Sequence, residues 1–154
     1  MPNFSFFDCA SWGCSTSLIL WKIWDKWLWK KFAGKSNIPI NIQGTWTGSL
    51  TSSYKCEEKK VKVIITQSFS KTKIELKTDQ ITSTSVCSYW ESDTSFPRLY
   101  YIYKTQNLGI PNTSNIPQNG LGIICVENSV KMSIDYVTSS LTKGTIHLVK
   151  IGHK

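Results

Sequence analysis

The chain has 154 residues, a formal charge of +8 at pH 7 and five cysteines. This length predicts one domain with an appendage, which we divide as residues 1–36 and 37–154. The odd number of cysteines, without a Cys-x-x-Cys pair, argues against a zinc site and favours a reducing compartment. The positive excess favours a polyanionic partner, nucleic acid or an anionic membrane, over neutral ligands, although solvated surface lysines are the alternative.

Residues 17–32 have the apolar period of an amphipathic helix. The apolar side holds Leu20, Trp21, Trp24, Trp27, Leu28 and Phe32, and the polar side holds Lys22, Asp25, Lys26 and Lys30. The longest apolar run, residues 18–21, is far shorter than the roughly 20 residues of a spanning helix. A short helix rich in tryptophan and lysine is typical of an anionic membrane surface. Packing on the rest of the domain or on another copy is the alternative.

The first residues carry no lysine or arginine before the apolar stretch, so we expect no secretory signal peptide. Residues 4–16 are moderately apolar and leave two interpretations open, the remnant of a membrane segment or a disordered start.

Beyond residue 40 the sequence alternates with the period of two that strands require. The predicted strands are 41–53, 61–67, 73–78, 81–89, 98–104, 121–126, 131–138 and 145–151. Short polar connections between them predict an all-β protein, a small eight-stranded antiparallel up-and-down barrel of lipocalin-like form. The interior of such a barrel is filled by side chains or holds one small ligand.

An up-and-down order places hydroxyl side chains at one end of the inward faces: Ser52, Thr78, Ser83, Ser85, Tyr103, Thr138 and Ser140. The middle and the other end are apolar apart from Gln67, with Trp46, Leu50, Ile65, Ile74, Leu76, Leu99, Cys125, Met132 and Ile134. Cys87 and Tyr89 are predicted to share the inward face of Ser83, and Cys87 and Cys125 to pack as small hydrophobes. This pattern predicts a ligand pocket open at the hydroxyl end. The alternative is that these hydroxyls only mark strand ends near solvent.

Lysines lie in the loops expected around the open end, Lys55, Lys59 and Lys60 in one and Lys143 in another. The longest of these loops, residues 105–120, is long enough to act as a lid. Tyrosines, hydroxyls and lysines at one mouth could stack on bases and neutralise phosphates.

Several segments, in this order, resemble one bacterial family: residues 44–53 (Gly-Thr-Trp-Thr-Gly-Ser-Leu-Thr-Ser-Ser), 65–67, Thr78, 83–85, 99–103 and 136–144. It is the SMODS-associating two-TM, β-strand-rich effector family of cyclic-oligonucleotide (CBASS) anti-phage defence, and the resemblance covers about residues 40–151. It implies a barrel on the cytoplasmic face of the bacterial inner membrane that binds a cyclic dinucleotide. Ligand binding would drive homo-oligomerisation and membrane disruption, with no DNA or RNA partner.

The residues expected near the ligand are Thr78, Ser83, Ser85, Tyr103, Tyr136, Thr138, Ser140, Thr142 and Lys143. The chain departs from the family pattern at Ser140, where the family has an arginine, and at Asn119-Gly120, where it has a histidine-glycine pair. Loss of an arginine removes a bidentate phosphate donor and could change affinity or ligand choice. The membrane segment is also too short for two spanning helices.

No nucleophile, base and acid stand at a recognisable spacing, and no glycine-rich phosphate loop is present, so we expect no enzyme, cofactor or metal. Three alternatives to an effector remain. They are a lipocalin-like carrier of an apolar ligand, to which Gly44-x-Trp46 alone would equally point, a binding-only nucleotide sponge, and a structural membrane module with a filled barrel.

Overall fold

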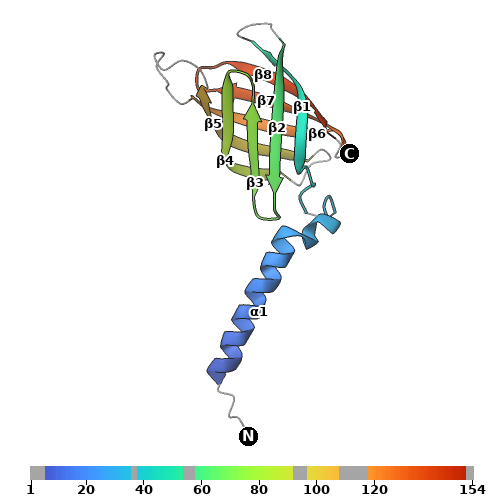
Figure 1. Ribbon diagram of the computed structural model, residues 1–154, viewed down its shortest axis with the longest axis vertical. Coiled ribbons are helices and arrows are strands. Elements are labelled where there is room, and N and C mark those ends of the chain that lie inside the picture. Colours follow the sequence, from blue (N-terminus) through green and yellow to red (C-terminus); the bar gives the residue numbers. More distant parts are fainter. Residues whose placement is uncertain (1–5, 36–37, 54–57, 92–96, 108–117, 152–154) are drawn as a thin grey trace.

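The computed structural model describes residues 6–35, 38–53, 58–91, 97–107 and 118–151. Within these ranges, helix α1 (Phe6–Lys26) and the 3-10 helix η1 (Leu28–Lys31) precede eight strands: β1 (Gly44–Ser52), β2 (Lys59–Gln67), β3 (Thr72–Lys77), β4 (Ile81–Glu91), β5 (Arg98–Asn107), β6 (Gln118–Val126), β7 (Lys131–Thr138) and β8 (Lys143–Lys150). Each strand pairs antiparallel with the next, and β8 pairs with β1 to close the barrel. The predicted up-and-down barrel behind an N-terminal helix is therefore confirmed (Figure 1).

One face of every strand builds the core. In β2, Val61, Val63, Ile65 and Gln67 are buried, whereas Lys62 and Thr66 on the opposite face are exposed. The other strands contribute further buried side chains, among them Trp46, Leu50, Ile74, Leu76, Leu99, Ile124, Met132, Ile134, Ile146 and Leu148. Each large apolar side chain that is fully buried stabilises the fold by roughly 1.5–3 kcal/mol, so this interior holds the barrel together.

A β-bulge in β4 corrects the predicted inward face of that strand. Ser83 pairs with Thr105 and Ser85 with Tyr103, but the register shifts before Cys87, which pairs with Ile102. Because a bulge inserts one extra residue, the alternation reverses beyond it. Cys87 and Tyr89 are therefore exposed, and the prediction that they share the inward face of Ser83 is wrong.

Strand β6 contains a second correction. Ile124 is fully buried and lies on the inward face, whereas its neighbour Cys125 is only partly buried and faces outward. Because side chains alternate, a shift of one residue in the assumed alternation moves every side chain of a strand to the opposite face. Cys125 was placed on the wrong face for this reason.

The end of the barrel nearer α1 is closed by a hydrogen-bonded plug. Gln67, the polar exception on the apolar face, accepts a bond from Ile42 N at 2.9 Å through Oε1 and donates one to Ile40 O at 2.9 Å through Nε2. Trp46 is 1% exposed and donates from Nε1 to Ile42 O at 3.0 Å. The segment before β1 is thus fastened across the base, with its buried polar groups paired.

Helix α1 differs from the predicted helix at both ends. It begins at Phe6 and ends at Lys26, after which η1 replaces the last α-helical turn expected up to Phe32. A disordered start is therefore wrong for residues 6–16. Among the described residues, no helix is long and apolar enough to cross a membrane. Leu18 and Leu20 are exposed on α1, which projects from the barrel (Figure 1).

The C-terminal end of α1 packs on the turn between β2 and β3. The ring of Phe69 lies 6.1–6.5 Å from the rings of Trp21, Trp24 and Trp29, measured between centroids. Asp25 accepts a hydrogen bond from Ser70 N at 2.7 Å. Although partial desolvation raises the pKa of Asp25, its hydrogen bonds with Ser70 and Ser68 together outweigh that effect and lower the pKa overall. The alternative of packing on the domain thus holds for this end of the helix.

Candidate ligand-binding site

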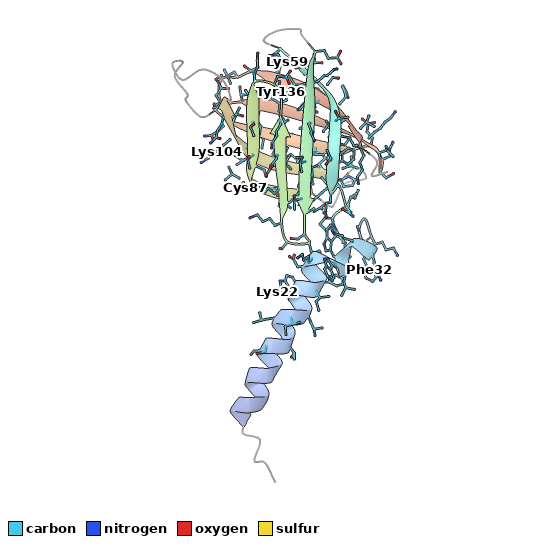
Figure 2. All side chains as sticks on the ribbon, in the orientation of Figure 1. Lys22, Phe32, Lys59, Cys87, Lys104 and Tyr136 are labelled. Atoms are coloured by element: carbon cyan, nitrogen blue, oxygen red, sulfur yellow. The ribbon has the colours of Figure 1, made fainter. Side chains whose placement is uncertain are left out.

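A cavity of about 240 Å³ opens at the end of the barrel farthest from α1. Its rim is polar and is formed where strands end or turn, by Ser52, Lys59, Thr78, Gln80, Gln118, Thr138 and Thr142. Its floor is apolar, with Leu50, Ile74, Leu76 and Ile146. A mostly apolar concavity with a few placed polar groups is the usual character of a small-molecule site. In Figure 2, Lys59 and Tyr136 mark this end of the molecule, opposite Lys22 and Phe32.

Three tyrosines line one side of the cavity, and each lies against a glycine on the adjacent strand. Tyr103 pairs in register with Gly120, Tyr101 with Gly122, and Tyr136 with Gly144. A Cβ added at Gly120 would lie 2.4 Å from Tyr103 Oη. One added at Gly122 would lie 2.4 Å from Tyr101 Cζ, and one at Gly144 2.6 Å from Tyr136 Oη. Each ring therefore occupies the space that a side chain in place of its glycine would need. The glycines thus determine where the rings lie.

The buried phenols stay protonated at neutral pH. Burial raises the pKa of Tyr101 far above its ordinary value, with a further contribution from Tyr103. Burial, followed by the proximity of Tyr136, raises the pKa of Tyr103 to about 12. A neutral phenol presents an O–H donor and an aromatic face. This wall of the cavity can therefore stack on a planar group and donate hydrogen bonds, but it carries no charge.

The predicted hydroxyls have partners within the barrel. Ser83 Oγ lies 2.8 Å from Thr105 Oγ1, and Ser85 Oγ accepts from Ile74 N at 2.9 Å. At the rim, Thr78 Oγ1 accepts from Ile81 N at 3.1 Å and Thr138 Oγ1 accepts from Thr142 N at 3.2 Å. Thr78 and Thr138 thus stabilise the turns that end β3 and β7, as the strand-end interpretation expects. Both also line the cavity, so the two interpretations are compatible.

Seven of the nine predicted ligand residues line the cavity: Thr78, Ser83, Ser85, Tyr103, Tyr136, Thr138 and Thr142. The other two do not. Ser140 is exposed in the turn after β7, and Lys143 is exposed at the start of β8, in register with outward-facing Val137. Contact of any of the nine with a ligand stays a prediction.

Sequence reasoning did not single out other lining residues, among them Tyr101, Thr105, Gln80 and Gln118. Continuing the alternation of Tyr101 and Tyr103 by two residues would have placed Thr105 on the same inward face. The sequence predicts Lys59 only as a loop lysine, because the predicted strand begins at Val61, whereas β2 begins at Lys59. The predicted lid, residues 105–120, is shortened at both ends by β5 and β6, and residues 108–117 lie outside the described residues. Lys55 also lies outside the described residues.

A family model described as Cap15, cyclic dinucleotide receptor domain, matches residues 36–150. The match covers well over half of the 154 residues and takes in every strand described above. A comparison with curated proteins finds no match. The chain belongs to the Cap15 cyclic dinucleotide receptor family, and the resemblance to cyclic-dinucleotide-sensing CBASS effectors is confirmed.

Proposed function

We propose that this member of the Cap15 receptor family binds its cyclic dinucleotide in the open cavity of the barrel. The observation that supports this site best is the tyrosine wall over an apolar floor, ringed by hydroxyl, amide and ammonium groups. Aromatic rings stack on bases of any identity, with about 1–3 kcal/mol for each base. The rim groups suit the ribose hydroxyls and the phosphodiester oxygens.

The size of the cavity limits how the ligand would bind. At about 240 Å³ it is somewhat smaller than the roughly 300–1,000 Å³ of ordinary ligand pockets. A cyclic dinucleotide would therefore place its bases inside and leave part of its ring at the rim. An exposed part of a bound ligand is available for contact with a second protein surface. Such contact supports a receptor whose ligand favours the assembled over the separate state.

We propose that assembly uses the outer face of β4–β7. Ile102 pairs in register with Cys87 and with Leu121, and Leu121 pairs with Val137. All four side chains are exposed, so an apolar row crosses four strands on the outside. The row carries no charge, whereas the protein as a whole is +8. Copies of a basic protein repel one another least across such a face.

We propose further that α1 brings the barrel to an anionic membrane surface in the bacterial cytoplasm. Its exposed Leu18, Ile19 and Leu20 accompany Lys22 and Lys26, and the exposed Trp27 follows directly after the helix. Apolar and cationic side chains together are what interfacial helices use. In this proposal the chain is a sensor and not an enzyme, and membrane damage follows from assembly.

The aliphatic floor favours one alternative, an apolar-ligand carrier. The two functions separate in thermal unfolding of the full chain with a panel of cyclic dinucleotides and a panel of fatty acids. A ligand at about 100 times its dissociation constant stabilises the fold by roughly 2.7 kcal/mol. We expect a rise in melting temperature with at least one dinucleotide and a smaller rise for Thr138→Ala. A rise with fatty acids alone would make the carrier the better function.

Binding without assembly would identify a sponge. Sedimentation of the full chain with and without the stabilising dinucleotide separates these cases. We expect a larger species only with ligand, and expect Leu121→Asp to bind but stay small.

A further inference from the structure

One lysine at the mouth of the cavity differs from the other strand lysines. Among those that the structure describes, only Lys59 and Lys150 lie at inward register positions, opposite Leu50 and Trp46 respectively. Lys150 lies at the base, with its Nζ 5.3 Å from the centre of the Trp46 ring. Lys59 lines the cavity at the open end, the end that Lys59 and Tyr136 mark in Figure 2.

The ammonium group of Lys59 is held by a neutral partner. Lys59 Nζ donates to Gln80 Oε1 at 3.0 Å, which joins the start of β2 to the turn between β3 and β4. An ammonium has three N–H donors, so two remain for a ligand. No carboxylate lines the cavity among the described residues, and the ion pair found among them is Lys73–Glu75, away from the mouth. The charge of Lys59 is therefore positioned without being neutralised.

No other described residue lining the cavity carries a charge. Burial keeps the phenols of Tyr101 and Tyr103 neutral, the rim groups other than Lys59 are hydroxyls and amides, and Lys143 lies outside the lining. A phosphodiester keeps its negative charge at neutral pH and needs compensation when it leaves water. Lys59 supplies that compensation at the rim, while the tyrosines offer their rings farther in.

We infer that Lys59 binds a phosphate of the ligand and thereby orients it, with the bases toward the tyrosines and the phosphodiester at the Lys59 side of the mouth. This inference rests on the proposed function. Lys59 then determines specificity for phosphate-bearing ligands over apolar ones. Its partner Gln80 is a positioning residue that directs the ammonium toward the mouth.

The chain offers a matched control in the neighbouring residue. Lys60 is exposed, faces outward and pairs with Ser49 rather than with an inward-facing side chain. Lys59→Gln and Lys60→Gln remove the same charge from adjacent positions, so long-range attraction falls equally in both. Lys59→Arg keeps the charge, and thermal unfolding without ligand shows whether each variant folds.

The test is titration calorimetry of the full chain with the cyclic dinucleotide that most stabilises it, at low and at high salt. A hydrogen bond to a charged group contributes roughly 1.5–3 kcal/mol, so we expect Lys59→Gln to weaken binding about 10- to 100-fold. Lys60→Gln should change it less than about twofold, and Lys59→Arg should retain most of it. Affinity should also fall less with salt in Lys59→Gln than in the wild type, because a screened contact is missing.

Equal affinity of Lys59→Gln and wild type would overturn the assignment and leave the proposed function intact. Equal weakening by Lys59→Gln and Lys60→Gln would overturn it as well, because only long-range charge would then matter. Failure of the wild-type chain to bind any dinucleotide would overturn the proposed function, and the Lys59 assignment with it.

Discussion

The two ends of the barrel are built from the same alternating strands but satisfy their inward polar groups differently. At the base, Gln67 and Trp46 are buried and their polar atoms bond to Ile40 and Ile42 within the protein. At the open end, hydroxyls and one ammonium surround a cavity whose wall is tyrosine on glycine. The comparison teaches that one sheet can close one end with paired polar groups and leave a polar-rimmed cavity at the other, and in our proposal stability and ligand binding belong to these opposite ends. Substitutions at the base should therefore leave ligand affinity unchanged as long as the barrel stays folded.

The largest effect on stability is expected at the base. Trp46→Ala removes a side chain that is 1% exposed and its bond to Ile42 O. Truncation of a buried tryptophan costs about 3–5 kcal/mol because it leaves a cavity. Urea denaturation of the full chain measures this loss, with exposed Thr66→Ala as the control. If Trp46→Ala abolished ligand binding while the barrel stayed folded, the separation of the two ends would be wrong.

At the open end, Gly122→Ala tests whether the glycines position the tyrosines. The new Cβ would lie 2.4 Å from Tyr101 Cζ, so the ring must move within a packed interior. Such overpacking costs about 1–3 kcal/mol. We expect the variant to lose more ligand affinity than stability, measured by calorimetry and urea denaturation. Asn119→Ala, an exposed change on the same strand, is the control, and unchanged affinity in Gly122→Ala would contradict the role of the glycines in positioning the tyrosines.

The smallest effect concerns Tyr103 and pH. Its pKa is raised to about 12 in the fold, chiefly by burial, whereas an unfolded tyrosine ionises near 10. The folded state thus holds the phenolic proton more tightly, and the resulting stability is fully present below pH 10 and is lost as pH rises from about 10 to 12. Tyr103→Phe should make this alkaline loss shallower in thermal unfolding at several pH values. An identical pH profile would show that Tyr103 is not protected from ionisation. At neutral pH Tyr103→Phe should hardly change stability.

The sequence predicts the fold well because alternation is local. The alternation of apolar and polar residues is enough to identify the buried faces of Gly44 to Ser52 and of Val61 to Gln67. The corrections fall where a local pattern has two solutions. Ser85, Val86 and Cys87 alternate acceptably in either register, and only pairing with β5 places the bulge between them. Ile124 and Cys125 are both apolar enough to be buried, so the sequence does not choose between their faces.

The site was predicted in part for a related reason. Thr78, Tyr103 and Thr138 follow from strand alternation and direction, and all three line the cavity. Lys59 depends on where β2 begins, and the tyrosine wall depends on which glycine each ring meets across the sheet. The packing of Phe69 on α1 likewise joins segments far apart in sequence. Such contacts depend on how distant segments pair and pack, and the sequence of a single strand does not show this.

The most direct test of the central claim is amide chemical-shift mapping of the full chain by NMR, titrated with the stabilising cyclic dinucleotide. The claim predicts that the largest shifts occur at the open end, at Ser83, Tyr103 and Thr138, and that Trp46 and Gln67 at the base stay nearly unchanged. Shifts concentrated at the base, or none at saturating ligand, would contradict it.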